Sequence, residues 1–126
     1  MAAGYIPNLA TEETPKLILQ CLKDKENIII FPEGTRSIPG KPLKLQRGAA
    51  NLAIRAPAEI RLIRLNVTKS GLTKQDRWLS IPQKRVQYSV AVGERIHPLR
   101  FLEEANEIPS LAARRLTAYL TQVLQV

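Results

Sequence analysis

The side chains best suited to chemistry in this chain gather in residues 31–37. Their sequence is Phe31-Pro32-Glu33-Gly34-Thr35-Arg36-Ser37. An apolar, β-branched run precedes them and a basic loop follows, a pattern that predicts a buried strand ending in a tight polar turn. This turn places a carboxylate, a hydroxyl, a guanidinium and a glycine within a few residues of each other, which is equipment for holding a phosphorylated polyol.

The individual groups fit that ligand. Arg36 can hold a phosphate through two parallel charge-assisted hydrogen bonds. Glu33 can accept hydrogen bonds from hydroxyls, and Gly34 lets backbone amides approach a ligand closely. Three cations of the following loop extend the positive field: Lys41, Lys44 and Arg47. The alternative is a turn that ends a strand and whose charges only face water.

The elements that must position this turn follow an α/β pattern. A capped helix start is predicted near residues 11–15, and its apolar face would make Cys21 a buried, inert thiol. Residues 28–31 are predicted as a buried strand whose carboxyl end carries the turn, where open α/β sheets bind ligands. The remaining predicted elements are a helix over 46–55, strands over 59–67 and 85–92 with the second half-buried, and a helix from about Ser110.

The turn also carries a family resemblance. Residues 31–37 resemble the third conserved block of the glycerolipid acyltransferases, the 1-acylglycerol-3-phosphate and glycerol-3-phosphate acyltransferases. Residues 2–6 are similar to the end of the second block, residues 44–49 to the stretch that opens the next helix, and residues 60–65 to the fourth block. The resemblance is good over residues 2–67 and weaker but compatible through Glu94.

The resemblance implies a glycerol-3-phosphate acyltransferase-like sheet flanked by helices. It also implies acyl transfer from acyl-CoA or acyl carrier protein to 1-acylglycerol 3-phosphate (lysophosphatidic acid), a step of phospholipid biosynthesis and lipid metabolism. No resident cofactor or metal is implied. The implied location is cytoplasmic and membrane-associated, peripheral on the inner face. The implied substrate-binding residues are Glu33, Gly34, Thr35, Arg36 and Ser37, with Thr35 and Ser37 shaping the turn.

The chain departs from the family at the catalytic block. Family members use a His-x4-Asp block in which histidine is the general base, and this block is absent here. The single histidine, His97, has no aspartate five residues on, so it is predicted to be a surface or turn residue. No catalytic residue is therefore assigned. We expect residues 1–126 to be a partial domain, a C-terminal fragment whose lost N-terminal elements leave an apolar edge and face uncovered, and which is inactive alone.

Charge adds an alternative function. The formal net charge is +8, and twelve Lys/Arg stand against two acidic residues between Arg36 and Arg85. That excess favours a polyanion, so a non-catalytic basic module bound to an anionic membrane surface is the competing hypothesis. Nucleic acid is disfavoured because aromatics are few and no helix-turn-helix or zinc spacing is present. A serine hydrolase is excluded because no Gly-x-Ser-x-Gly occurs.

Overall fold

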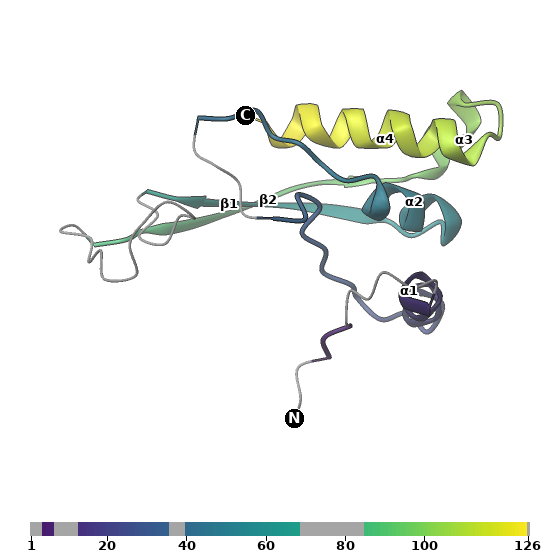
Figure 1. Cartoon of the computed structure of the whole chain (residues 1–126), viewed down its shortest axis with the longest axis horizontal. Coiled ribbons are helices and arrows are strands. Elements are labelled where there is room, and N and C mark those ends of the chain that lie inside the picture. The colour runs from purple at the N-terminus through teal and green to yellow at the C-terminus, as the bar shows by residue number, and fades with distance from the viewer. Residues whose placement is uncertain (1–3, 7–12, 36–39, 69–84, 126) are drawn as a thin grey trace.

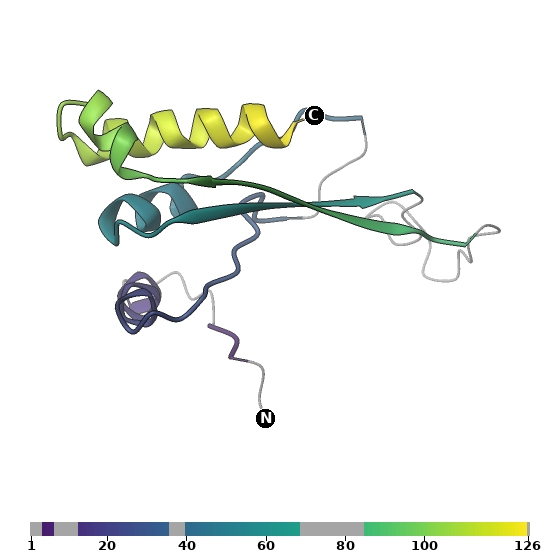
Figure 2. The same cartoon turned by 180° about the vertical axis from the view of Figure 1, so that it is seen from behind.

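The computed structural model describes residues 4–6, 13–35, 40–68 and 85–125. In these parts of the chain the elements are α1 (Glu13–Lys23), α2 (Gly48–Arg55), β1 (Ile60–Val67), β2 (Tyr88–Ile96), α3 (Leu99–Glu104) and α4 (Pro109–Leu124). The two strands form an antiparallel sheet, α4 lies along one of its faces, and α1 lies on the other side (Figures 1 and 2). Helices with a small sheet are compatible with the predicted α/β class, while the family-like strand arrangement stays a prediction.

The two strands give the sheet two different faces. The register pairs Ile63 with Val92 and Leu65 with Val90, with an irregularity between Arg61 and Ile63. Because side chains alternate along a strand, Leu62 and Arg64 point to the α4 side, which we call the inner face. Six apolar side chains point away from α4 and define the outer face: Ile63, Leu65, Val67, Tyr88, Val90 and Val92.

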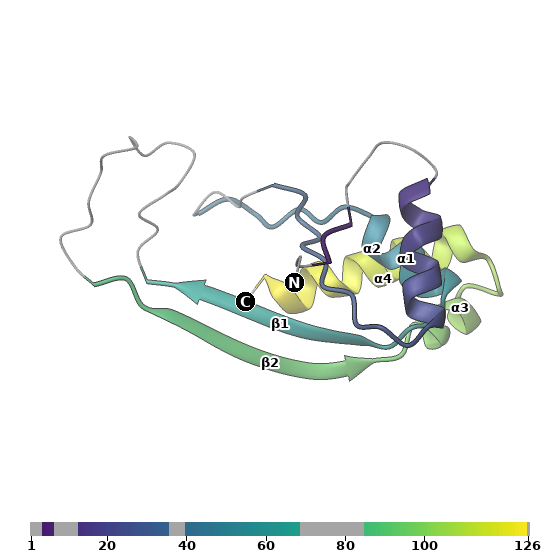
Figure 3. The same cartoon turned by 90° about the horizontal axis from the view of Figure 1, so that it is seen from below.

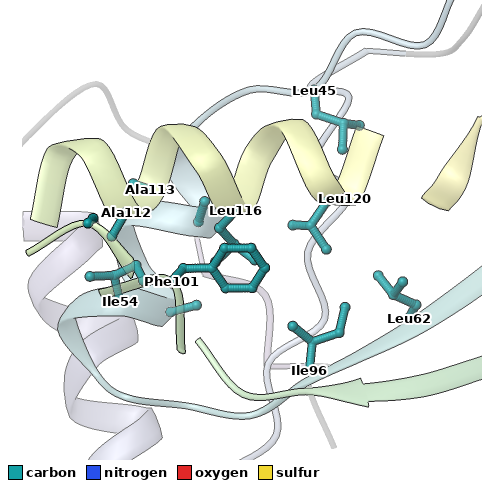
Figure 4. Packing of buried hydrophobic residues seen from close by; sticks show 12 residues of the cluster. Leu45, Ile54, Leu62, Ile96, Phe101, Ala112, Ala113, Leu116 and Leu120 are labelled. Carbon is teal, nitrogen blue, oxygen red and sulfur yellow. The ribbon is translucent and has the colours of Figure 1, made fainter. Parts of the chain in front are cut away.

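The core lies between the inner face and α4. Leu116 and Leu120 of α4 point toward Phe101 of α3, Ile96 of β2 and Leu62 of β1 (Figure 4). Alanines pack α2 against α4: Ala50 and Ala53 on α2, and Ala112 and Ala113 on α4, are all buried. Small side chains at such a contact let two helices approach closely.

Polar contacts fasten the sheet to α4. The Arg64 guanidinium donates a hydrogen bond to the Val123 carbonyl at 2.7 Å, in the last turn of α4. A cation at this position suits the carbonyl end of a helix. The Tyr119 hydroxyl donates to the Glu94 carboxylate at 2.8 Å. Helix α4 is thus fixed to both strands of the hairpin.

The buried strand predicted over residues 28–31 is wrong. These residues adopt no regular secondary structure, and Ile29 is 81% exposed. A strand is stable only beside a partner, and residues 27–30 make no backbone hydrogen bond with any part of the chain that the structure describes. The β-branched sequence is present, but the neighbour that would convert it into a strand is not among the described residues.

Three of the other predicted elements are confirmed. The helix over 46–55 is confirmed as α2, the strand over 59–67 as β1 and the helix from about Ser110 as α4. The strand over 85–92 exists as β2, but the prediction that it is half-buried is wrong because its apolar side chains are exposed. Helix α3 was not predicted. The prediction that Cys21 is a buried thiol is wrong: the residue is only partly buried, and no other residue of α1 is buried either. None of the described helices is long and apolar enough to cross a bilayer.

Candidate functional site

The polar turn after residue 31 is closed by its own backbone. The Gly34 amide donates to the Phe31 carbonyl at 3.3 Å, and Gly34 has φ +69°, in the left-handed region. Glycine adopts this conformation without the steric cost that a Cβ brings. Glu33 is half-buried, whereas Thr35 is exposed. The prediction of a tight polar turn at this point is therefore confirmed as far as residue 35.

The turn is docked on the segment that leads into α2. The Gln46 amide donates to the Pro32 carbonyl at 2.7 Å. A Cβ on Gly34 would lie 3.3 Å from Cγ of Gln46, so the side chain of Gln46 packs against the turn as well. This contact brings residues 32–34 to the N-terminus of α2 across a separation of more than ten positions in the sequence.

Apolar and basic residues alternate in the segment that leads into α2, and this alternation decides which side chains face the core. Leu45 is buried in the core cluster (Figure 4), and the partly buried Leu43 packs against that cluster. An extended segment points successive side chains in opposite directions, so Lys44 is turned outward and is exposed. Lys41 and Arg47 are exposed too. Packing of Leu43 and Leu45 in the core thus fixes the backbone to which these exposed cations are attached.

The electrostatics of this corner favour an anion. Arg47 is the N-cap residue of α2, its side chain makes no capping hydrogen bond, and the first turn of α2 contains no acidic residue. The first amides of a helix carry partial positive charge and have no partner within the helix. No ion pair between described residues neutralises Lys41, Lys44 or Arg47. The Glu33 carboxylate likewise has no hydrogen bond or ion pair with a described residue.

The predicted site residues are brought together in part. Glu33, Gly34 and Thr35 share one turn, and the Gln46–Pro32 hydrogen bond places that turn beside the loop of Lys44 and Arg47. Arg36 and Ser37 lie outside the described residues, so their predicted roles stay predictions. Sequence reasoning missed Gln46 as the docking residue. Its backbone amide, not its side chain, makes the hydrogen bond, and a backbone contact leaves no compositional signal.

The histidine lies elsewhere. His97 is exposed, and its Nδ1 is 3.4 Å from Oε1 of Glu59, whose other oxygen is 3.8 Å from Nη1 of Arg95. The prediction that His97 is a surface residue is confirmed. Among the described residues no group of three or more His, Cys, Asp or Glu side chains could hold a metal ion.

Comparison with known proteins identifies one family. A family model described as Acyltransferase matches residues 8–67, which include α1, the turn, the basic loop, α2 and β1. No curated protein and no solved structure matches the chain. The matched residues contain the whole corner described above and end with the last residue of β1. Residues 8–67 are therefore similar to the acyltransferase family, and this likeness supports a general acyltransferase function.

Proposed function

We propose that this chain supplies the acceptor-binding part of an O-acyltransferase that acts on 1-acylglycerol 3-phosphate, with acyl-CoA or acyl carrier protein as donor. One observation carries the proposal: the turn of Glu33 and Gly34, inside the acyltransferase-matched residues, is hydrogen-bonded to the start of an uncapped, cationic helix N-terminus. A glycerol phosphate offers the complementary groups, a phosphate and hydroxyls. The product of this transfer enters phospholipid biosynthesis.

The geometry suggests a division of roles. Lys44 and Arg47 flank the N-terminus of α2 and are suited to the phosphate. The Glu33 carboxylate is suited to accept a hydrogen bond from the glycerol hydroxyl. Resemblance assigns Arg36 a second phosphate contact and gives Thr35 and Ser37 a part in shaping the turn, while Lys41 strengthens the field. Each role concerns binding: Glu33 would hold the reacting hydroxyl as a hydrogen-bond acceptor, while the family resemblance assigns removal of its proton to the histidine of the His-x4-Asp block.

Acyl transfer needs that proton acceptor. The acceptor oxygen attacks the thioester carbonyl, the carbon–sulfur bond breaks, and the hydroxyl proton must leave to a base before it reaches the departing thiolate. The family's His-x4-Asp block does not occur in residues 1–126, and His97 is paired with Glu59 at the end of the sheet. We therefore expect the purified chain to bind the acceptor without turnover.

The test separates binding from chemistry. Isothermal titration of the chain with 1-acylglycerol 3-phosphate should show binding that Lys44→Ala and Arg47→Ala each weaken about tenfold, the value of one phosphate contact. Arg55→Ala is the matched control, because Arg55 is an exposed cation at the other end of α2. Equal weakening by all three variants would contradict the proposed site.

The acyl-transfer assay uses acyl-CoA or acyl carrier protein with the same acceptor. No product is expected from residues 1–126, and adding a polypeptide that carries the His-x4-Asp block is expected to restore turnover. Turnover by the chain alone that His97→Ala abolishes would overturn our account of the base. The DNA upstream of the Met1 codon provides a direct check, since a His-x4-Asp stretch is expected there.

The exposed cations of the loop also favour the second candidate, a basic module at an anionic membrane surface. A lysophospholipid acceptor resides in the bilayer, so contact of Lys41, Lys44 and Arg47 with lipid headgroups is expected for both candidate functions. The same contact would hold the protein at the inner, cytoplasmic face of the membrane. Flotation with phosphatidylglycerol vesicles tests this contact. Indifference to lipid charge would remove this candidate. Vesicle binding without selective binding of 1-acylglycerol 3-phosphate would favour it over acyl transfer.

A further inference from the structure

Lys44 lies on the side of its segment that faces the polar turn. In residues 43–46 the two leucines belong to the core, whereas Lys44 and Gln46 are exposed. The Gln46 side chain is packed against the turn, because its Cγ would lie 3.3 Å from a Cβ on Gly34. Side chains two positions apart in an extended segment point the same way, so Lys44 is directed to the turn side as well. Figure 3 shows the turn and the segment side by side.

The charges of the corner formed by the turn and residues 41–47 are unbalanced. Lys41, Lys44 and Arg47 bring three positive charges and Glu33 one negative charge, so these described residues have a net charge of +2. None of the four forms an ion pair with another described residue. The sequence has no aspartate or glutamate between Glu33 and Glu59. An anion at this corner therefore meets positive charge that no described neighbour neutralises.

Phosphate esters differ in the charge that they bring to such a corner. A phosphomonoester loses its second proton with a pKa of about 6 and approaches a dianion near neutral pH, whereas a phosphodiester keeps one negative charge. Coulomb attraction scales with the product of the charges, so the dianion is attracted to the same cations about twice as strongly. The monoester also offers one more terminal oxygen for charge-assisted hydrogen bonds. A net charge of +2 matches the dianion.

We propose that the corner selects phosphomonoester dianions over phosphodiester monoanions, and that Lys44 distinguishes the two. Its ammonium group, directed to the turn side, binds the oxygen that only the monoester leaves free, while Arg47 contacts the charge that both esters share. The inference rests on the proposed function, which assigns an acceptor phosphate to this corner, and adds the class of phosphate that is accepted. Acceptors whose phosphate carries a second ester are then bound poorly.

Two pairs of ligands test the selection by isothermal titration of the chain. The monoesters are 1-acylglycerol 3-phosphate and glycerol 3-phosphate, and the methyl ester of each phosphate is the matched diester. At about pH 8 each monoester should bind about tenfold more tightly than its methyl ester. At about pH 5, where the monoester has gained a proton, most of this preference should disappear.

The methyl esters also control for titration of the protein. The charged side chains of the described corner are those of Glu33, Lys41, Lys44 and Arg47, and the first turn of α2 adds no carboxylate. A methyl ester has no proton to lose between these pH values, so any pH dependence of its binding reports protein groups, His97 included. The difference between the two pH profiles then belongs to the phosphate.

Two substitutions that remove one positive charge each test the role of Lys44. Lys44→Gln should weaken binding of the monoester about tenfold and of the methyl ester no more than about threefold, so the preference falls. Arg55→Gln is the matched control, because Arg55 is exposed at the other end of α2, and it should leave the preference unchanged. An equal loss for both esters in Lys44→Gln would overturn the role given to Lys44.

The remaining outcomes separate this inference from the proposed function. Equal binding of monoester and methyl ester at both pH values would overturn selection by charge and leave the acceptor site standing. Absence of binding by either acylated ligand would contradict the proposed function and this inference together. Glycerol 3-phosphate should show the same pH step as 1-acylglycerol 3-phosphate. A step confined to the acylated pair would assign it to the charge of lipid aggregates and would overturn the proposal.

Discussion

Gly34 is the residue at which one added carbon would disturb both the turn and its docking. A left-handed conformation costs a residue with a Cβ about 1 kcal/mol, and the new carbon would press on Gln46. We expect Gly34→Ala to destabilise the chain by at least about 1 kcal/mol, measured by urea unfolding. Gly40→Ala is the control, because Gly40 has φ +80° and open space around it. An equal loss in both variants would mean that the contact with Gln46 contributes nothing.

Cys21 provides a pH-dependent prediction at the same scale. The thiol is hydrogen-bonded to the Glu26 carboxylate, which raises the pKa of Cys21 above its usual value. The protonated thiol is favoured in the folded chain, so its stabilising effect is present below the ordinary thiol pKa and is lost as pH rises through the folded one. Glu26→Gln should lower the pKa of Cys21 and move the pH profile of alkylation by iodoacetamide toward lower pH. Glu103→Gln, remote on α3, should leave the profile where it is.

The candidate site was predictable at this scale because its signal is local. Glu33 and Gly34 stand together in the sequence, and the cations of the loop follow within a few positions. The docking by Gln46 was not predictable, because an amide that any residue could supply makes the hydrogen bond. The exposure of Cys21 was not predictable either. The helical periodicity around Cys21 correctly predicts α1, but periodicity does not say whether another element covers the apolar face of that helix.

Among the elements, α4 depends on a cation from the sheet. Arg64 donates to the Val123 carbonyl, while its Nε is buried without a partner among the described residues. Arg64→Ala should lower the free energy of unfolding by about 2 kcal/mol through the lost charged hydrogen bond and stem packing. Arg64→Met should cost about half as much, because the stem remains and the unpaired Nε disappears.

The control for this pair is Arg55→Ala, an exposed change expected to stay within about 0.5 kcal/mol. Chemical denaturation measures all three variants. If Arg64→Met were as costly as Arg64→Ala, the stem would contribute nothing and the hydrogen bond to α4 would account for the whole effect.

Elements with their own periodicity were predicted well, and those that depend on a neighbour were not. Alternation in β1 and β2 and helical spacing in α4 reflect which side chains point in the same direction, which the sequence contains. Residues 28–31 have an equally clear strand composition, yet they form no strand. A strand needs hydrogen-bond partners from another segment, and no described segment supplies them to these residues. Composition predicts what a segment can form, and pairing decides what it forms.

For the whole molecule, the division between a buried inner face and an open outer face has a measurable consequence. Val90→Thr replaces a methyl on the outer face, so the free energy of unfolding should change by no more than about 0.5 kcal/mol. Leu116→Ala, inside the core, should cost about 2–5 kcal/mol. Thermal unfolding by circular dichroism compares the two. A large loss for Val90→Thr would show that the outer face is covered in solution.

Fold class followed from the order of helices and strands, whereas the layering did not. The expectation of an uncovered apolar face agrees with the exposure of Ile63, Leu65 and Val90, although the reason given for it, lost N-terminal elements, stays a prediction. Burial of a sheet face depends on which surfaces come together in space, and alternation along β2 is the same whether or not a layer covers it.

The alanine contact between α2 and α4 couples the candidate site around Lys44 and Arg47 to the core. Alanine has no side-chain rotamers, so the spacing of the two helices does not change with rotamer exchange, and Leu45 fixes the entering loop to the same core. The amide of Gln46 should therefore exchange with solvent hydrogen only when the amide of Leu116 does, through global unfolding. Warming the protein would leave Lys44 and Arg47 in place until the whole core melts.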